Sequence, residues 1–143
     1  MNLGRLSQKN ILIIQGPHMP LISHMLKPNP DKITINVINK TLKTTAKKFN
    51  CKVKILQTPH EGLAVRTIQK NRKKVNGIII FPGPWQQTGH SINNTLNILK
   101  IPFVTILINE KKEILNGIKN IQNRNTILSC KQAIESISQL IKI

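Results

Sequence analysis

A chain of 143 residues that is 39% hydrophobic has the size of one domain with one core, and we expect a single domain over residues 1–143. Its 22 Lys and Arg residues against 5 Asp and Glu residues give a net charge of +17, which favours nucleic acid, anionic lipid or a small anionic metabolite over a cationic partner. No apolar run approaches the roughly 20 residues of a membrane helix and the N-terminus lacks a signal-peptide layout, so we expect a soluble, cytoplasmic protein.

The first predicted elements are a buried strand, a long loop and an amphipathic helix. The apolar run Asn10–Ile14 is rich in β-branched residues, and Gly16-Pro17 closes this strand with a turn. Four prolines and no consistent period predict a loop over residues 17–33, and loops of this length usually serve a site or a contact. Apolar residues at helical spacing then predict a helix that begins after Thr34, as its N-cap, and continues to about Phe49.

The rest of the chain alternates between strand and helix patterns. The predicted elements are a strand at Lys52–Leu56, a helix at Glu61–Asn71, a strand at Gly77–Phe81, a helix at Ser91–Leu99, a strand at 102–108, a short strand at Thr126–Leu128 and a helix at Lys131–Ile143. The segment 111–119 has no clear pattern. This alternation predicts an α/β protein whose five-stranded parallel sheet is covered on both faces.

Three loops of this predicted sheet are candidates for a ligand site. In an open parallel sheet, ligands bind beyond the carboxyl ends of the strands, where the strand order reverses. The loops in question are Gln15–Leu21, Phe81–Ser91 and Leu107–Glu110, which follow the first, third and fourth predicted strands. Trp85, the single tryptophan, lies in the second loop, where it either stacks on a ligand or packs in the core.

A set of short motifs occurs in a fixed order in these loops and in the segment Gln57–Gly62. The motifs are Gly16-Pro17, His60-Glu61-Gly62, Pro82-Gly83 and Thr88. Their order and spacing over roughly residues 10 to 108 resemble the type II 3-dehydroquinate dehydratases. The resemblance implies a flavodoxin-like three-layer sandwich, a lyase of the shikimate pathway, and trimers that assemble into a dodecamer. It also implies that His60-Glu61 begins a helix near subunit contacts and is not the catalytic pair.

The side chains that do the chemistry in this family are replaced in the present sequence. Alignment places Met25 where the family has an arginine and Pro30 where it has a tyrosine base. The family's glutamate and histidine, which act together as the acid, fall on Thr105 and Leu107. No other tyrosine can take over, because the chain contains none. The positions that hold the substrate carry other residues as well, and we interpret these as a vestigial, more apolar ligand pocket: His18, Phe81, Gln87 and Asn109.

The sequence therefore favours a degenerate, catalytically inactive homologue that keeps a structural or binding role. One alternative is a working dehydratase with a rebuilt site, in which His18, His24 or His90 transfers protons. The plainer interpretation of these histidines is capping, packing or solvation.

The second alternative is a basic scaffold or nucleic-acid-associated protein. The cluster Lys70, Arg72, Lys73, Lys74 at a helix end either binds phosphate or complements the helix dipole. The positive charge can also arise without selection for binding. Lys, Asn and Ile are abundant together in this chain, and an AT-rich genome favours the codons of these three residues. We expect at most a weak, non-specific anionic or nucleic-acid partner.

The two cysteines carry no sign of metal or redox chemistry. Cys51 and Cys130 have no Cys or His partner at ligand spacing. We expect both to be buried, and we expect no metal site and no cofactor.

Overall fold

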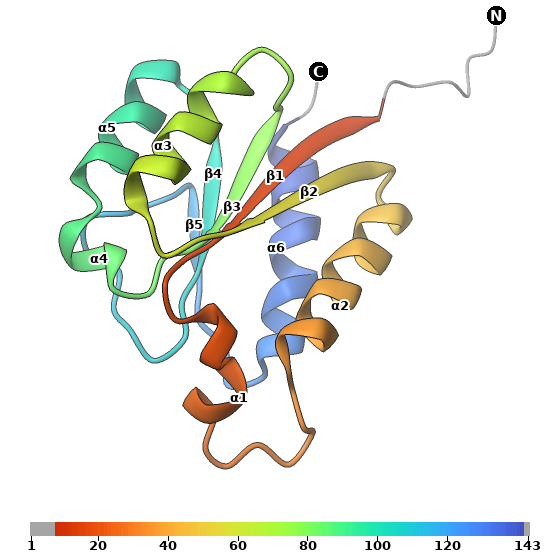
Figure 1. The fold of residues 1–143 in the computed structure, drawn as a ribbon. Coiled ribbons are helices and arrows are strands. Elements are labelled where there is room, and N and C mark those ends of the chain that lie inside the picture. The colour runs from red at the N-terminus through yellow and green to blue at the C-terminus, as the bar shows by residue number, and fades with distance from the viewer. Residues whose placement is uncertain (1–7, 142–143) are drawn as a thin grey trace, which may run out of the picture.

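Five strands form one parallel sheet in the computed structural model, which describes residues 8–141 (Figure 1). The strands are β1 Lys9–Gln15, β2 Cys51–Gln57, β3 Gly77–Phe81, β4 Phe103–Ile106 and β5 Lys119–Ile121. Their order across the sheet is β2-β1-β3-β4-β5. The chain adds β2 on one side of β1 and β3 on the other, so the strand order reverses next to β1. The predicted α/β fold with a five-stranded parallel sheet is confirmed.

The centre of the sheet is built from continuous apolar runs. Residues 11–14 of β1 and 77–81 of β3 are buried along their whole length, and Ile13 pairs with Ile79. A central strand of a parallel sheet is covered on both faces, so it needs apolar side chains in both directions rather than alternation.

Four amphipathic helices cover the two faces of the sheet (Figure 1). The pair α2 Ile35–Lys48 and α6 Thr126–Leu140 lies on one face, and the pair α3 Glu61–Lys70 and α5 His90–Leu99 lies on the other. Each pair encloses its own apolar core against the sheet. Thr34 caps α2 as predicted, because its hydroxyl accepts a hydrogen bond from the Val37 N–H.

The predicted loop over residues 17–33 contains more structure than its prolines suggest. It includes a 3₁₀ turn η1 Met19–Leu21 and the short helix α1 Ile22–Met25. Together with the short helix α4 Trp85–Thr88, this segment lies at the carboxyl ends of the strands, at the bottom of Figure 1. Buried Met19 and Ile22 anchor the segment in the core beneath α2 and α6.

The predicted strand Thr126–Leu128 is wrong, because these residues are the first turn of α6. Asn125 caps that turn, since its side-chain oxygen accepts a hydrogen bond from the Leu128 N–H. The last helix therefore runs from Thr126 to Leu140 instead of beginning at Lys131. The fifth strand is the three-residue β5, which pairs with the edge of β4.

Both cysteines are free and buried, as predicted. Burial raises the pKa of the Cys130 thiol to about 12, so this thiol is an apolar core side chain at neutral pH. Within residues 8–141 no three His, Cys, Asp or Glu side chains gather in a way that could hold a metal ion. Over the same residues no helix is long and apolar enough to cross a membrane.

Candidate functional site

A crevice of about 460 Å³ lies beyond the carboxyl ends of β1, β3 and β4. The loops that follow these three strands meet there, as the general rule for open parallel sheets predicts. The lining residues are His18, Met25, Gly83, Pro84, Gln86, Gln87, Ile108, Asn109, Glu110, Lys111 and Glu113. A cavity of this size falls in the range of small-molecule sites.

The crevice brings together three of the four residues predicted for the ligand pocket. His18 comes from the loop after β1, Gln87 from α4 and Asn109 from the loop after β4. All three side chains are exposed at the crevice. Phe81 is different: it is 2% exposed and packs into the core on the α2 and α6 side. It reaches only a narrow inner hollow of about 10 Å³ beside the crevice.

The four residues that the resemblance assigns to the family's catalytic positions, Met25, Pro30, Thr105 and Leu107, are dispersed in the structure. Met25 lines the crevice, where its backbone oxygen accepts a hydrogen bond from the Asn109 side chain at 3.4 Å. Pro30 is exposed and lies outside the lining. Thr105 is fully buried and donates to Asn120 at 2.6 Å, and Leu107 lines a separate hollow. Of the apolar residues Met25, Phe81 and Leu107, Met25 alone lines the crevice.

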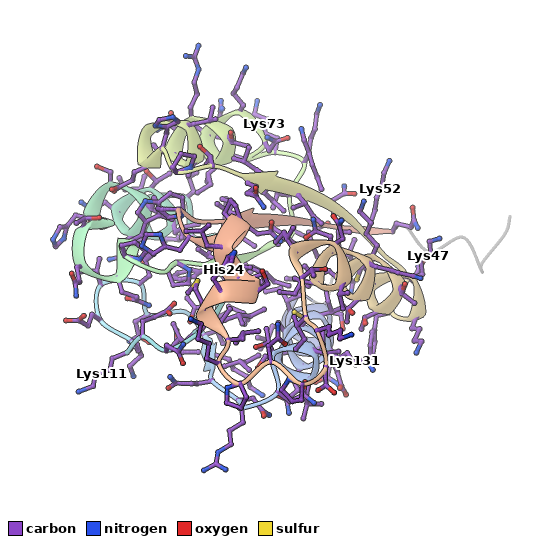
Figure 2. The ribbon with its side chains drawn as sticks, turned by 60° about the horizontal axis from the view of Figure 1, so that its bottom comes forward. His24, Lys47, Lys52, Lys73, Lys111 and Lys131 are labelled. Atoms are coloured by element: carbon purple, nitrogen blue, oxygen red, sulfur yellow. The ribbon has the colours of Figure 1, made fainter. Side chains whose placement is uncertain are left out.

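The histidines considered for proton transfer do not converge. His18 is the one that lines the crevice. His24 is exposed on α1 (Figure 2), and His90 is exposed at the start of α5 without capping it through its side chain. A rebuilt site in this crevice would therefore depend on His18.

Glu110 is a crevice residue that the sequence reasoning missed. Its Oε1 accepts from the Ile108 N–H at 3.0 Å, and its Oε2 accepts from the Gly83 N–H at 3.1 Å. Burial raises the pKa of this carboxyl above its ordinary value, while the two backbone hydrogen bonds act in the opposite direction. The available signal was its place directly after Asn109, in a chain with only 5 acidic residues.

Gln86 is a second residue that the sequence reasoning missed. It is 1% exposed, and its side-chain oxygen accepts from the backbone N–H groups of Glu113 and Leu115, both at 2.9 Å. Its amide nitrogen donates to the Leu115 oxygen at 2.8 Å. These bonds fasten α4 to the segment after β4, so both walls of the crevice are held in one position. Trp85 beside it is 3% exposed and packs in the core, which leaves it no surface for stacking on a ligand.

Gly16 allows the loop after β1 and the loop after β3 to approach each other. Its N–H donates to the Phe81 oxygen at 2.9 Å, and a Cβ at this position would lie 2.8 Å from the same oxygen. Any side chain here would push the loop after β1 away from the loop after β3. This contact explains why a glycine stands at the start of the loop after β1, beside the narrow inner hollow.

The strand order and the crevice at its reversal point define an α/β protein of the flavodoxin-like class. The family model described as dehydroquinase class II matches residues 9–134, and the chain belongs to this family.

Curated relatives agree with this assignment, and solved structures share the fold. A 3-dehydroquinate dehydratase of Buchnera aphidicola is 34% identical over 99 residues, which are 69% of this chain and 66% of the relative. One from Prochlorococcus marinus is 35% identical over 99 residues, 69% of this chain and 68% of the relative. A type II dehydroquinase from Butyrivibrio crossotus has a TM-score of 0.72 at 19% identity and covers 96% of this chain and 100% of its own. A 3-dehydroquinate dehydratase-like protein from Bifidobacterium longum has a TM-score of 0.73 at 13% identity. The match covers 95% of this chain and 100% of the chain from Bifidobacterium longum.

Proposed function

We propose that this protein is a class II dehydroquinase family member without dehydratase activity, which keeps its crevice and fold for a structural or binding role. The observation that carries the proposal is the content of the crevice. The positions that the resemblance assigns to the family's arginine, base and acid pair hold Met25, Pro30, Thr105 and Leu107, of which Met25 alone lines the crevice. The chain has no tyrosine that could replace the base.

The physical argument concerns proton transfer. Removing water through an enolate requires a base that reaches the carbon beside the carbonyl and donors for the developing oxyanion. Each lost proton-transfer role costs about 10²–10⁴-fold in rate. Glu110 is held at the wall of the crevice, because each of its oxygens accepts a backbone hydrogen bond.

A turnover assay tests the proposal directly. The purified protein is incubated with 3-dehydroquinate, and formation of the conjugated enone product is followed by absorbance. We expect no turnover above the uncatalysed rate, and calorimetry with the same compound should show no saturable heat in the micromolar range. The dehydratase of Buchnera aphidicola, assayed in parallel, is the positive control. Turnover above the uncatalysed rate that is lost on a substitution in the crevice would contradict the proposal.

A working dehydratase with a rebuilt site is the second candidate. The observation that favours it is the position of His18, an exposed imidazole in the crevice, since imidazole serves as a general base near neutral pH. The matched variants are His18→Ala and His24→Ala, because His24 lies on the same segment but outside the crevice. Turnover that disappears in the first variant and persists in the second would establish this candidate.

The retained fold also supports a proposal about assembly. The family implies trimers that build a dodecamer, and we propose that this chain forms a trimer-based homo-oligomer. Leu63 on α3 and Ile98 on α5 are 44% and 77% exposed, which leaves apolar surface on this face of the protomer. Light scattering coupled to size exclusion should give a mass that is a multiple of three protomers. A monomer at micromolar concentration would contradict this proposal.

A further inference from the structure

A second cavity, of about 290 Å³, lies at the opposite end of the sheet from the crevice. Its walls are the amino-terminal halves of β1 and β2 and the turn that follows α3. Three lysines line it: Lys52 and Lys54 from β2 and Lys74 from the turn. Within residues 8–141 no Asp or Glu side chain lines this cavity, which we call the lysine hollow. Positive groups from two separate elements therefore surround one cavity.

The register of the sheet directs Lys52 and Lys54 to the same side of β2. Side chains two residues apart in a strand point to the same face and lie about 7 Å apart. Lys54 pairs with Leu12, which belongs to the core on the α3 and α5 side, whereas Val53 packs against the core on the α2 and α6 side. Because β2 is an edge strand, both lysines stay exposed although they point to the face that α3 and α5 cover further inward.

Hydrogen bonds fix the turn that carries Lys74 against β1. The side-chain amide of Asn10 donates to the Lys74 oxygen at 3.0 Å, and the Lys74 N–H donates to the Asn71 oxygen at 2.9 Å. The Asn10 N–H donates in turn to the side-chain oxygen of Asn76 at 2.8 Å. The third lysine therefore extends from a backbone position that is fixed relative to the strands.

The C-terminus of α3 opposes an anion at this place, but its effect is the smaller one. A helix C-terminus carries a partial charge of about half a unit, which fades within the last turn. The Thr67 oxygen near that end already accepts two hydrogen bonds from Asn71, at 3.1 and 2.8 Å. Glu61, the acidic residue of α3, lies in the first turn at the other end of the helix. Three full positive charges outweigh this partial negative charge.

We infer that the lysine hollow binds a small phosphorylated anion, with Lys52, Lys54 and Lys74 as its charge partners. Ammonium groups are compact point charges that bind phosphate, and a dianion gains more from three of them than a monocarboxylate does. The volume is at the lower end of the range of small-molecule sites, and Leu12 and Val75 give the lining an apolar part for an organic group. The inference goes beyond the proposed function, because this site does not depend on what the crevice does.

Calorimetry with inorganic phosphate, at an ionic strength held constant with sodium chloride, tests the inference. The wild-type protein should bind phosphate saturably and acetate more weakly. In the double variant Lys52→Gln, Lys54→Gln the Kd for phosphate should rise by about tenfold or more. The matched control is Lys40→Gln, Lys43→Gln, which removes the same two charges from the exposed side of α2 and should change the Kd by less than about twofold. All four lysines are exposed, so both variants should fold.

Lysine acetylation by a small activated ester, followed by mass spectrometry, locates the bound anion on the wild-type protein. Phosphate should slow the acetylation of Lys54 and Lys74 more than that of Lys40. An oligonucleotide should instead protect lysines over the whole surface, because its binding follows the general positive charge.

Three outcomes would overturn the inference. The first is the absence of saturable heat with phosphate up to millimolar concentration. The second is equal weakening by the two double variants, or equal protection of Lys40 and Lys74, since either result would mean that general surface charge attracts the anion. The third is protection of the lysine hollow by the oligonucleotide but not by phosphate, which would make it part of a polyanion-binding surface. The turnover assay reports on the crevice alone, so failure of the proposed function and failure of this inference can be told apart.

Discussion

At the scale of single residues, the direction in which each side chain points decides which residues a ligand in the crevice would contact. His18, Gln87 and Asn109 lie where the rule for parallel sheets places ligand-binding residues, so their meeting was predictable from the strand pattern. Phe81 and Leu107 were not predictable in the same way. Each ends or follows a strand, where a shift of one residue turns the side chain to the opposite face, and both point away from the open crevice.

Glu110 should make the stability of the fold depend on pH. Burial raises the pKa of this carboxyl above its ordinary value of 4.5, so the folded protein holds the proton more tightly than the unfolded chain. The resulting stabilisation is fully present below about pH 4.5 and is lost as the pH rises through the folded-state pKa. His18, Lys111 and Glu113 line the same crevice and can modify the size of the effect.

Urea unfolding measures how the free energy of unfolding depends on pH. The experiment compares the wild-type protein with Glu110→Gln between pH 4 and pH 8, roughly the range of carboxyl and imidazole titration. As the pH rises above 4.5, the free energy of unfolding of the wild-type protein should fall relative to that of the variant. Glu113→Gln, which removes one negative charge from the same crevice, corrects for the general charge effect. A difference that rises with pH would contradict the direction of the pKa shift.

At the scale of elements, hydrogen bonds from one buried side chain hold the crevice wall in place. The segment between β4 and β5 has little regular structure, yet Leu115 is fully buried and Gln86 satisfies its backbone groups. Buried backbone groups outside a helix or sheet need such partners. This contact was not predictable from the residue pattern, because a glutamine in a loop is usually solvated and only the fold brings Leu115 beside it.

Replacement of Gln86 by leucine should release this wall. The substitution leaves the N–H groups of Glu113 and Leu115 without their acceptor, and each buried group that stays unpaired costs about 1–3 kcal/mol. We expect the free energy of unfolding to fall by about 2–4 kcal/mol. Amide hydrogen exchange at Glu113 and Leu115 should also become faster than in the wild-type protein, while exchange within the sheet should change little.

The neighbouring residue offers a matched control. Gln87 lies on the same helix α4, but its side chain is exposed, so Gln87→Leu should change the free energy of unfolding by less than about 0.5 kcal/mol. Equal destabilisation by the two substitutions would show that the buried hydrogen bonds of Gln86 are not what holds the segment.

Element boundaries show a related limit of sequence reasoning. The long, periodic elements were predicted correctly, including β1, α2 and β3. The run Thr126–Leu128 is too short for its period to separate a strand from a helical turn, and the cap at Asn125 decides in favour of the helix. The real fifth strand has three residues and is only partly buried, so no apolar run marks it.

At the scale of the whole molecule, the alternation of strands and helices predicts the parallel sheet. The positive charge of the protein is distributed over several sides of its surface. Figure 2 shows Lys47, Lys52, Lys73, Lys111 and Lys131 projecting from different sides of the protein. These residues belong to α2, β2, the turn after α3, the loop after β4 and α6. A dispersed positive charge attracts polyanions in general, but it carries no pattern that reads a base sequence.

Nucleic-acid binding should therefore be non-specific and steeply dependent on salt. Binding by lysines releases counterions, so affinity falls linearly on a log-log plot with salt concentration. Fluorescence anisotropy with unrelated duplexes and single strands, at about 50 and about 150 mM salt, should show similar affinities for all of them at low salt and a large loss at the higher salt. Reversing Lys70, Arg72, Lys73 and Lys74 to Glu should reduce binding no more than reversing four exposed lysines elsewhere, such as Lys40, Lys43, Lys47 and Lys48 on α2. A complex that survives physiological salt, prefers one sequence and depends on the first set alone would instead identify a selected nucleic-acid site at the end of α3.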